Sequence, residues 1–121
     1  MDRISRGKAP GPPGPRPVVF LMHGLTAGSN SYTYLGPKHS IAYNLADAGY
    51  DVWMGNARGN RFSRRHTSMD PDKDKLRFFD FTFEEIALND LPAMFDYILA
   101  KTKQAKLHYI GHSQGGTVFL I

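Results

Sequence analysis

The sequence predicts an α/β fold in which a parallel β-sheet lies between helices. Its first support is three short, mostly apolar runs of the kind that form strands buried on both faces: Val18–Met22, Tyr50–Met54 and Leu107–Ile110. Its second support is a pair of helical patterns between these runs, at about residues 40–48 and 82–103. Strands and helices that alternate at this spacing are typical of βαβ units with right-handed crossovers.

Length and composition are ordinary for one globular domain or part of one. The chain has 121 residues, of which 41% are hydrophobic and 21% are charged. It has no cysteine, which excludes disulfides and thiolate metal sites. The net charge of +4 comes from scattered Lys and Arg residues, many interleaved with Asp, and indicates a solvated surface rather than a nucleic-acid site. No segment is long and apolar enough to span a bilayer, and the first six residues lack the apolar core of a secretory signal.

Most of the prolines fall within residues 7–17, which we interpret as a stiff connection at the surface. The first predicted helix, from Ser40 to Ala48, would place Ile41, Leu45 and Ala48 on its apolar face and end at Gly49. Residues 55–80 are expected to form a long loop. Its Asp-rich part resembles the start of a calcium loop, but Lys75 and Phe81 occupy the positions that require Gly and Glu, so we reject calcium.

The second helix has a clear start. Thr82 and Glu85 have the spacing of a capping box, and Phe81 can pack against Ile86 as a hydrophobic staple. Pro92 predicts a kink or a fresh start near Asp90. An apolar stripe continues through the helix, and its members are Leu91, Phe95, Ile98 and Leu99.

The third strand leads directly into Gly111-His112-Ser113-Gln114-Gly115, and a short apolar segment follows. A strand, G-x-S-x-G and a helix in this order form the nucleophile elbow of the α/β-hydrolases. Such a tight turn predicts a positive φ at Ser113. Gly111 and Gly115 are needed because a Cβ at either position would collide with the neighbouring strand or helix.

A serine in an elbow is a candidate nucleophile for acyl transfer, provided that a base and an oxyanion hole accompany it. One oxyanion donor in this fold is the N–H of the residue after the nucleophile, here Gln114. We predict Leu25 N–H as the second donor, since Gly24 lets the loop after Val18–Met22 approach the elbow. His112 is expected to pack beside the elbow rather than to act as base, and no histidine has the spacing of a metal site.

Taken together, these motifs resemble the acid lipase family of gastric and lysosomal lipases. The segments that carry the resemblance are His23-Gly24-Leu25, Ala48 through Asn60, Ser63 through His66, Phe79-Asp80-Phe81, Asp90 through Ala93, and Gly111 through Gly115. The resemblance implies an α/β-hydrolase that cleaves triacylglycerols or cholesteryl esters through an acyl-serine. It places the nucleophile on Ser113 and the oxyanion donors on Leu25 and Gln114. The chain departs from the family at Thr26, where an apolar residue is usual, and at Gly116, where Thr is usual.

The resemblance also implies a domain organisation. Residues 1–17 would be a Pro/Gly-rich N-terminal segment, and residues 18–121 the N-terminal part of a lipase domain, cut after the nucleophile elbow. Val18–Met22 would lie between the other two strands, and Arg3-Ile4 would be a remnant of an earlier strand. The triad acid and histidine of this fold follow the serine, whereas eight residues follow Ser113 here. The chain is therefore expected to be an incomplete lipase that is inactive alone.

The expected partner is a neutral lipid ester at a lipid–water interface, without cofactor, metal or nucleic acid. Family resemblance suggests a secreted or lysosomal protein. Two alternatives remain open: a hydrolase of another acyl ester or thioester, and a non-catalytic pseudo-enzyme.

Overall fold

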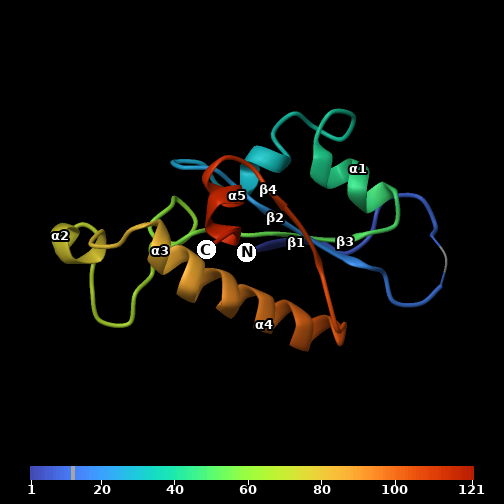
Figure 1. Cartoon of the computed structure of the whole chain (residues 1–121). Coiled ribbons are helices and arrows are strands. Elements are labelled where there is room, and N and C mark those ends of the chain that lie inside the picture. Colours follow the sequence, from blue (N-terminus) through green and yellow to red (C-terminus); the bar gives the residue numbers. More distant parts are fainter. Residues whose placement is uncertain (12) are drawn as a thin grey trace.

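One four-stranded sheet forms the centre of the molecule. The computed structural model describes residues 1–11 and 13–121. The strands are β1 (Asp2–Ile4), β2 (Val18–Met22), β3 (Asp51–Met54) and β4 (His108–Gly111), in the spatial order β1-β3-β2-β4 (Figure 1). β2 pairs in parallel with β3 and with β4, while β1 is antiparallel to β3. The predicted parallel core with Val18–Met22 at its centre is therefore confirmed, and β1 adds a strand from within the Pro/Gly-rich segment.

The helical elements lie between and after the strands. They are η1 (Ser29–Tyr32), α1 (Ile41–Asp47), α2 (Lys75–Phe78), α3 (Phe83–Glu85), η2 (Ile86–Asp90), α4 (Leu91–Thr102) and α5 (Gln114–Phe119). η1 is a 3-10 helix and η2 is a single π-helical segment. None of these helices, within the described ranges, is long and apolar enough to cross a membrane.

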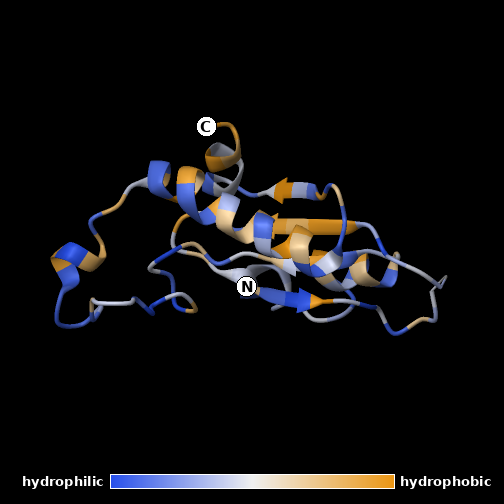
Figure 2. Ribbon diagram, turned by 90° about the horizontal axis from the view of Figure 1, so that it is seen from below, coloured by the Kyte–Doolittle hydropathy of each residue, from blue (hydrophilic) through white to orange (hydrophobic). Residues whose placement is uncertain are grey.

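Two apolar cores lie on opposite faces of the sheet, because alternate residues of β2 point to opposite sides. Val18, Phe20 and Met22 join the core that η2, α4 and α5 cover. Val19 and Leu21 join the core beneath η1 and α1. Figure 1 shows α4 and α1 on opposite sides of the sheet, and Figure 2 shows the uniformly apolar central strand. Helices on both faces were predicted, and the structure confirms them.

The predicted apolar face of the first helix is correct for Leu45, which packs against the core, and wrong for Ile41 and Ala48. Ala42 and Ala46 are the buried residues of α1, whereas Ile41 is 40% exposed and Ala48 is exposed. Ser40 is the N-cap, so the helix begins at Ile41. Residues four apart lie on the same face of a helix, and the face that meets the sheet carries Ala42 and Ala46. Two alanines let the helix backbone approach the strands closely. Gly49, with φ of +105°, ends the helix as predicted.

The long loop predicted for residues 55–80 contains a short helix, which the sequence analysis missed. α2 spans Lys75–Phe78 and buries Phe78. The turn before it is held by side-chain contacts, since the Asp70 carboxylate accepts from the N–H groups of Asp72 and Lys73. A helix of one turn has too few residues to show a periodic pattern, so it cannot be predicted from hydrophobic periodicity.

The start of the α3–α4 segment follows the prediction. The Glu85 carboxylate accepts from Thr82 N–H at 2.6 Å and Thr82 Oγ1 accepts from Glu84 N–H at 3.1 Å, so the capping box is present. The helix then widens into η2 before α4 begins at Leu91. Pro92 has no N–H to donate to the preceding turn. The π-helical segment η2, which ends at Asp90, is therefore the irregularity that Pro92 predicted there.

The strand order fixes where a site can form. β2 and β4 are neighbours, but the chain leaves β2 toward α1 on one face and leaves β4 into α5 on the other face. Such a switch point opens a crevice at the carboxyl ends of the two strands, where ligands of open α/β sheets bind. The loops that begin at His23 and at His112 meet there.

Candidate active site at the carboxyl ends of β2 and β4

Ser113 stands at the sharp reversal between β4 and α5. Its backbone has φ of 55° and ψ of −121°, so the positive φ predicted for an elbow serine is confirmed. Gly115 N–H donates to His112 O at 2.9 Å and Gly116 N–H donates to Ser113 O at 2.9 Å, which closes the turn. The Ser113 side chain is exposed at the crevice. A non-glycine residue in this conformation stores roughly 1–3 kcal/mol, which surrounding structure must offset.

The two glycines of the elbow are required by the space around them. A Cβ on Gly111 would lie 2.5 Å from Gly115 O and 2.6 Å from Gly116 N. A Cβ on Gly115 would lie 2.7 Å from His23 O and would also collide with Met22 O. These contacts are with backbone atoms, which cannot rotate away. The predicted reason for both glycines is thus confirmed: the first lets α5 approach β4, and the second lets α5 approach the end of β2.

Gly24 brings the loop after β2 against the nucleophile. A Cβ on Gly24 would lie 3.1 Å from Ser113 Cβ and 3.4 Å from His112 Nδ1. Ala27 N–H donates to Gly24 O at 3.2 Å, so Leu25 and Thr26 form the tip of a turn beside the elbow. Among the described residues, the N–H groups of Leu25 and Gln114 donate no hydrogen bond, and both remain available to a ligand oxygen. Their role as oxyanion donors remains a prediction.

His23 is buried at the start of this loop, and both of its ring nitrogens have partners. Ala57 N–H donates to His23 Nε2 at 3.0 Å, so the proton resides on Nδ1, which donates to Gly24 O at 2.8 Å. Burial lowers the pKa of His23 by disfavouring the imidazolium. With both nitrogens occupied, His23 cannot serve as a base for Ser113.

No histidine described in the structure is a base for the nucleophile. Ser113 Oγ accepts or donates no hydrogen bond with any described histidine. His112 is exposed. It lies beside the elbow, close to Gly24. His66 lies in the 55–80 loop, where its Nδ1 accepts from the N–H groups of Ser68 and Met69. Nor do three or more His, Asp or Glu residues of the described chain gather as a metal site.

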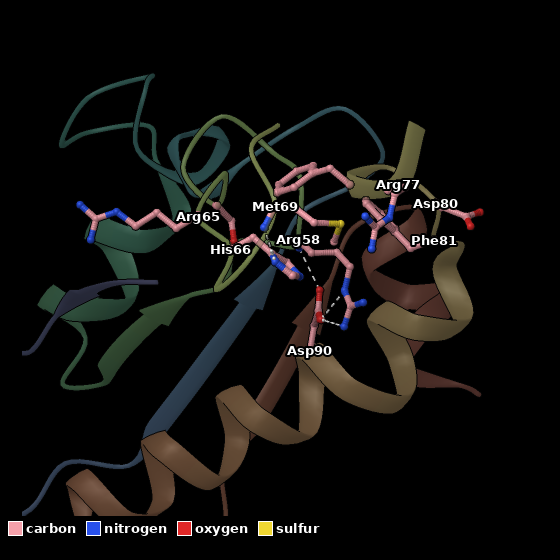
Figure 3. A pocket seen from close by; sticks show the side chains of 10 residues that line it. Arg58, Arg65, His66, Met69, Arg77, Asp80, Phe81 and Asp90 are labelled. Carbon is pink, nitrogen blue, oxygen red and sulfur yellow. Dashed lines mark hydrogen bonds and ion pairs between the residues drawn. The ribbon is translucent and has the colours of Figure 1, made fainter. Parts of the chain in front are cut away.

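Several cavities lie near these loops, including one of about 380 Å³ between Thr26, Gly28 and Asn60. A cavity of about 530 Å³ adjoins the elbow, and apolar side chains such as Ala27, Tyr32, Tyr34, Ile41 and Ile110 line much of it. Another cavity of about 320 Å³ lies under the 55–80 loop (Figure 3). Figure 3 shows the Arg58 guanidinium turned toward Asp90, to which its Nε donates. The cavity of about 530 Å³ reaches the turn through Gly24, Gly111 and His112.

Sequence reasoning missed several polar groups that support the site. Tyr109 of β4 donates its hydroxyl to Gly115 O at 2.5 Å, and burial raises the pKa of that phenol. Tyr32 donates to Met22 O at 2.7 Å, and burial raises the pKa of Tyr32 to about 12. Asn56 and Asn60 also face the loop after β2. The two asparagines were visible in the sequence as part of a conspicuous motif, whereas nothing marked the tyrosines as more than core residues.

Comparison with known proteins agrees with this geometry. A sequence model of the alpha/beta hydrolase fold matches residues 17–121. The chain is 50% identical over 122 aligned residues to human gastric triacylglycerol lipase, covering 100% of this chain and 30% of that protein. It is 54% identical over 105 residues to Lipase 1 of Drosophila melanogaster, covering 87% of this chain and 24% of that protein. It is 47% identical over 122 residues to human Lipase member M, covering 100% of this chain and 28% of that protein. The chain thus spans less than a third of each of these relatives.

Proposed function

We propose that this chain, which belongs to the alpha/beta hydrolase fold family and is acid lipase-like in sequence, carries the nucleophile and the oxyanion donors of a serine-dependent lipase. The observation that carries the proposal is the conformation of Ser113, whose φ of 55° sits at a strand-to-helix turn beside the Gly24 loop. A serine in an ordinary turn has no reason to hold a strained backbone. In an elbow, the strained backbone has a reason, because it presents the serine side chain as a nucleophile.

The chemistry proposed is acyl transfer through a covalent intermediate. Ser113 Oγ attacks the carbonyl carbon of an ester while its proton passes to a base, and a tetrahedral oxyanion forms. The N–H groups of Leu25 and Gln114 stabilise this oxyanion, because they are free and flank the nucleophile. The oxyanion then collapses, the C–O bond to the alcohol breaks, and the alcohol leaves with a proton. Water hydrolyses the acyl-serine in the second half of the reaction and restores Ser113.

The substrate proposed is a neutral lipid ester such as a triacylglycerol or a cholesteryl ester. The apolar cavity beside the elbow supports this choice, since an acyl chain needs an apolar surface next to the nucleophile. Tyr34 lines this cavity and is 72% exposed, and Leu25 and Leu35, which are next to the lining residues Gly24 and Tyr34 in the chain, are 68% and 56% exposed. Exposed apolar side chains around a site are suited to contact with a lipid–water interface. One relative is named a triacylglycerol lipase, which supports the same class.

The test is turnover that depends on Ser113. Ser113→Ala should lower the rate of tributyrin hydrolysis by the gene product that carries these 121 residues by at least about 10³-fold, the scale for loss of a triad member. Ser68→Ala, at an exposed serine of the 55–80 loop, is the matched control and should retain the parent rate. Equal rates for the parent and Ser113→Ala would overturn the proposal.

We further propose that residues 1–121 by themselves turn over esters little faster than Ser113→Ala does. No described histidine forms a hydrogen bond with Ser113 Oγ, and both ring nitrogens of buried His23 have other partners, so no base is in place to accept the proton. Hydrolysis of a short-chain nitrophenyl ester by the purified 121-residue chain checks this point. Serine-dependent turnover there would require a base among the five histidines of the chain.

A further inference from the structure

The segment Gly55 through Asn60 contributes neither the nucleophile nor an oxyanion donor, yet the side chains of Asn56 and Asn60 contact the loop that carries Leu25. Asn60 Nδ2 lies 3.2 Å from His23 Nε2, 2.8 Å from Asn56 Oδ1 and 3.5 Å from Ala27 O. Its Oδ1 accepts from Phe62 N–H at 2.9 Å. The amide of Asn60 is therefore engaged on both sides, and two of its contacts are with residues 23–27, at His23 and Ala27.

His23 can accept a hydrogen bond from the Asn60 amide only when its imidazole is neutral. Its Nε2 accepts from Ala57 N–H and faces Asn60 Nδ2, so that nitrogen carries no proton. Its Nδ1–H donates to Gly24 O, and this contact fixes the first peptide of the loop. The imidazole thereby joins the end of β2 to the segment after β3.

Asn56 holds the other end of the same loop. Its Oδ1 accepts from Ser29 N–H at 2.9 Å, and its Nδ2 donates to Ser29 Oγ at 3.2 Å. Ser29 Oγ in turn donates to the Asp2 carboxylate of β1 at 2.6 Å. Hydrogen bonds thus tie the loop at His23, at Ala27 and at Ser29, on both sides of Leu25.

The loop needs such support because it has little of its own. Leu25 is 68% exposed, so its side chain does not anchor the loop in the core. Thr26 adopts φ of 61°, which a β-branched residue avoids and which persists only where the surroundings enforce it. The backbone contact from Ala27 N–H to Gly24 O closes the turn but does not attach it to the sheet.

We propose that Asn60 and His23 are positioning residues, whose buried hydrogen bonds hold the loop so that Leu25 N–H stays aimed at the oxyanion of Ser113. This inference rests on the proposed function for its catalytic half. An oxyanion donor acts on the transition state and not on the bound ester, so its displacement lowers kcat and leaves KM unchanged. A residue that only stabilised the fold would lower the amount of folded enzyme instead.

The test compares Asn60→Ala with Asn44→Ala, at an exposed asparagine of α1 that lies outside this network. Hydrogen exchange followed by mass spectrometry on the gene product reports the loop directly, in peptides that contain residues 23–31 and 55–62. Asn60→Ala should raise exchange in both peptides, and Asn44→Ala in neither. Per folded molecule, Asn60→Ala should lower kcat at least ten-fold with KM within two-fold of the parent.

An isosteric variant separates positioning from packing. Asn60→Asp keeps the acceptor for Phe62 N–H but replaces the donor to His23 Nε2 by a carboxylate, which favours a protonated imidazole. The charged groups around this position are Arg61, which lines the same cavity as Asn60, Asp2, through Asn56 and Ser29, and Arg58 with Asp90. The acid limb of the kcat profile should therefore move to higher pH in Asn60→Asp, a change that loss of packing alone would not cause.

Unchanged exchange in residues 23–31 of Asn60→Ala would overturn the inference, and so would raised exchange with an unchanged kcat. Lack of Ser113-dependent turnover in the parent is a different result, which would overturn the proposed function. In that case the exchange measurement still decides whether Asn60 holds the loop.

Discussion

Two adjacent glycines of the elbow show how far single atoms determine what the site tolerates. Gly115 has backbone atoms on the side where a Cβ would point, with His23 O at 2.7 Å. Gly116, the next residue in α5, has only Gly111 O at 3.7 Å, which is an ordinary contact distance. Glycine is therefore required at position 115 and not at position 116.

We predict opposite effects of the two alanine substitutions. Gly115→Ala should destabilise the protein by about 2–4 kcal/mol, because a backbone clash at the junction of α5 and β2 forces the elements apart. Gly116→Ala should stabilise it by about 0.5–1 kcal/mol, since alanine loses less chain entropy than glycine in a helix. Urea unfolding of the two variants and the parent measures both. Similar losses at the two positions would contradict this view of the elbow.

His23 predicts a pH dependence of stability that originates in a buried neutral imidazole. The ordinary pKa of histidine is 6.5, and burial lowers the pKa of His23 in the folded protein. Below about pH 6.5 the unfolded chain therefore binds a proton that the folded chain does not, so the His23 contribution to stability falls as pH falls, by at most about 1.4 kcal/mol per pH unit. Above that pH the contribution is constant.

The measurement is the free energy of unfolding of the parent and of His23→Gln at several pH values from 5 to 8. The advantage of the parent should be full at pH 7.5 and should shrink toward pH 5. His39→Gln, at an exposed histidine, is the matched control and should not reproduce this narrowing. An advantage that grows toward acid would mean that His23 is charged in the folded state.

At the scale of elements, the irregular start of the long helix carries Asp90, which binds the segment after β3. The π-helical η2 ends at Asp90, immediately before α4 and Pro92. Asp90 Oδ2 accepts from Arg58 N–H at 2.8 Å, and Oδ1 accepts from Arg58 Nε at 2.8 Å (Figure 3). The helix thus holds the segment after β3 from the side opposite to the loop of Leu25, and the same segment carries Asn56 and Asn60.

Asp90→Ala should cost about 1.5–3 kcal/mol of stability, the range for charge-assisted hydrogen bonds of a partly buried carboxylate. The matched control is Asp72→Ala, whose ion pair with Arg64 has a similar distance of 2.9 Å but whose side chain is 79% exposed. Solvent screening should limit that loss to less than about 1 kcal/mol. Thermal midpoints of the two variants compare them directly, and equal shifts would show that Asp90 is no more than a surface charge.

At the scale of the whole molecule, the sheet and its two cores leave one side apolar and uncovered. β4 pairs only with β2 among the strands described, so its outer edge offers unpaired backbone groups. Phe119, the last residue of α5, and Leu120 and Ile121, which follow it, are 53%, 85% and 55% exposed. An open strand edge next to exposed apolar side chains favours association of the 121-residue chain with itself.

We predict that Leu120→Lys shifts the 121-residue chain from aggregates toward monomer, because it places a charge within this apolar patch. Leu76→Lys is the matched control, since Leu76 is 92% exposed on α2, apart from the C-terminal patch. Size-exclusion chromatography with light scattering gives the fraction of monomer for each. A parent chain that is already a stable monomer, or equal gains in both variants, would contradict the prediction.

The sequence by itself determined the class of fold and the position of the sharp turn at Ser113. Local chemistry was sufficient for both: apolar runs specify strands that are buried on both faces, and a strand that reverses into a helix within five residues needs Gly111 and Gly115 around Ser113. Thr82 and Glu85 likewise fixed a helix start, since a capping box is made within one turn. Each of these features depends on residues that are close together in the chain, so its pattern can be recognised in the sequence alone.

Only the tertiary structure decided which face of α1 meets the sheet and what holds the loop after β2. The helix buries Ala42 and Ala46 because of its distance from the strands, which no periodicity reveals. His23, Asn56 and Asn60 meet although 33 or more residues of chain separate His23 from the asparagines, and their bonds exist only once β2 and β3 pair in parallel. Hydrogen bonds between distant polar groups are set by strand order and register, and these are properties of the folded chain.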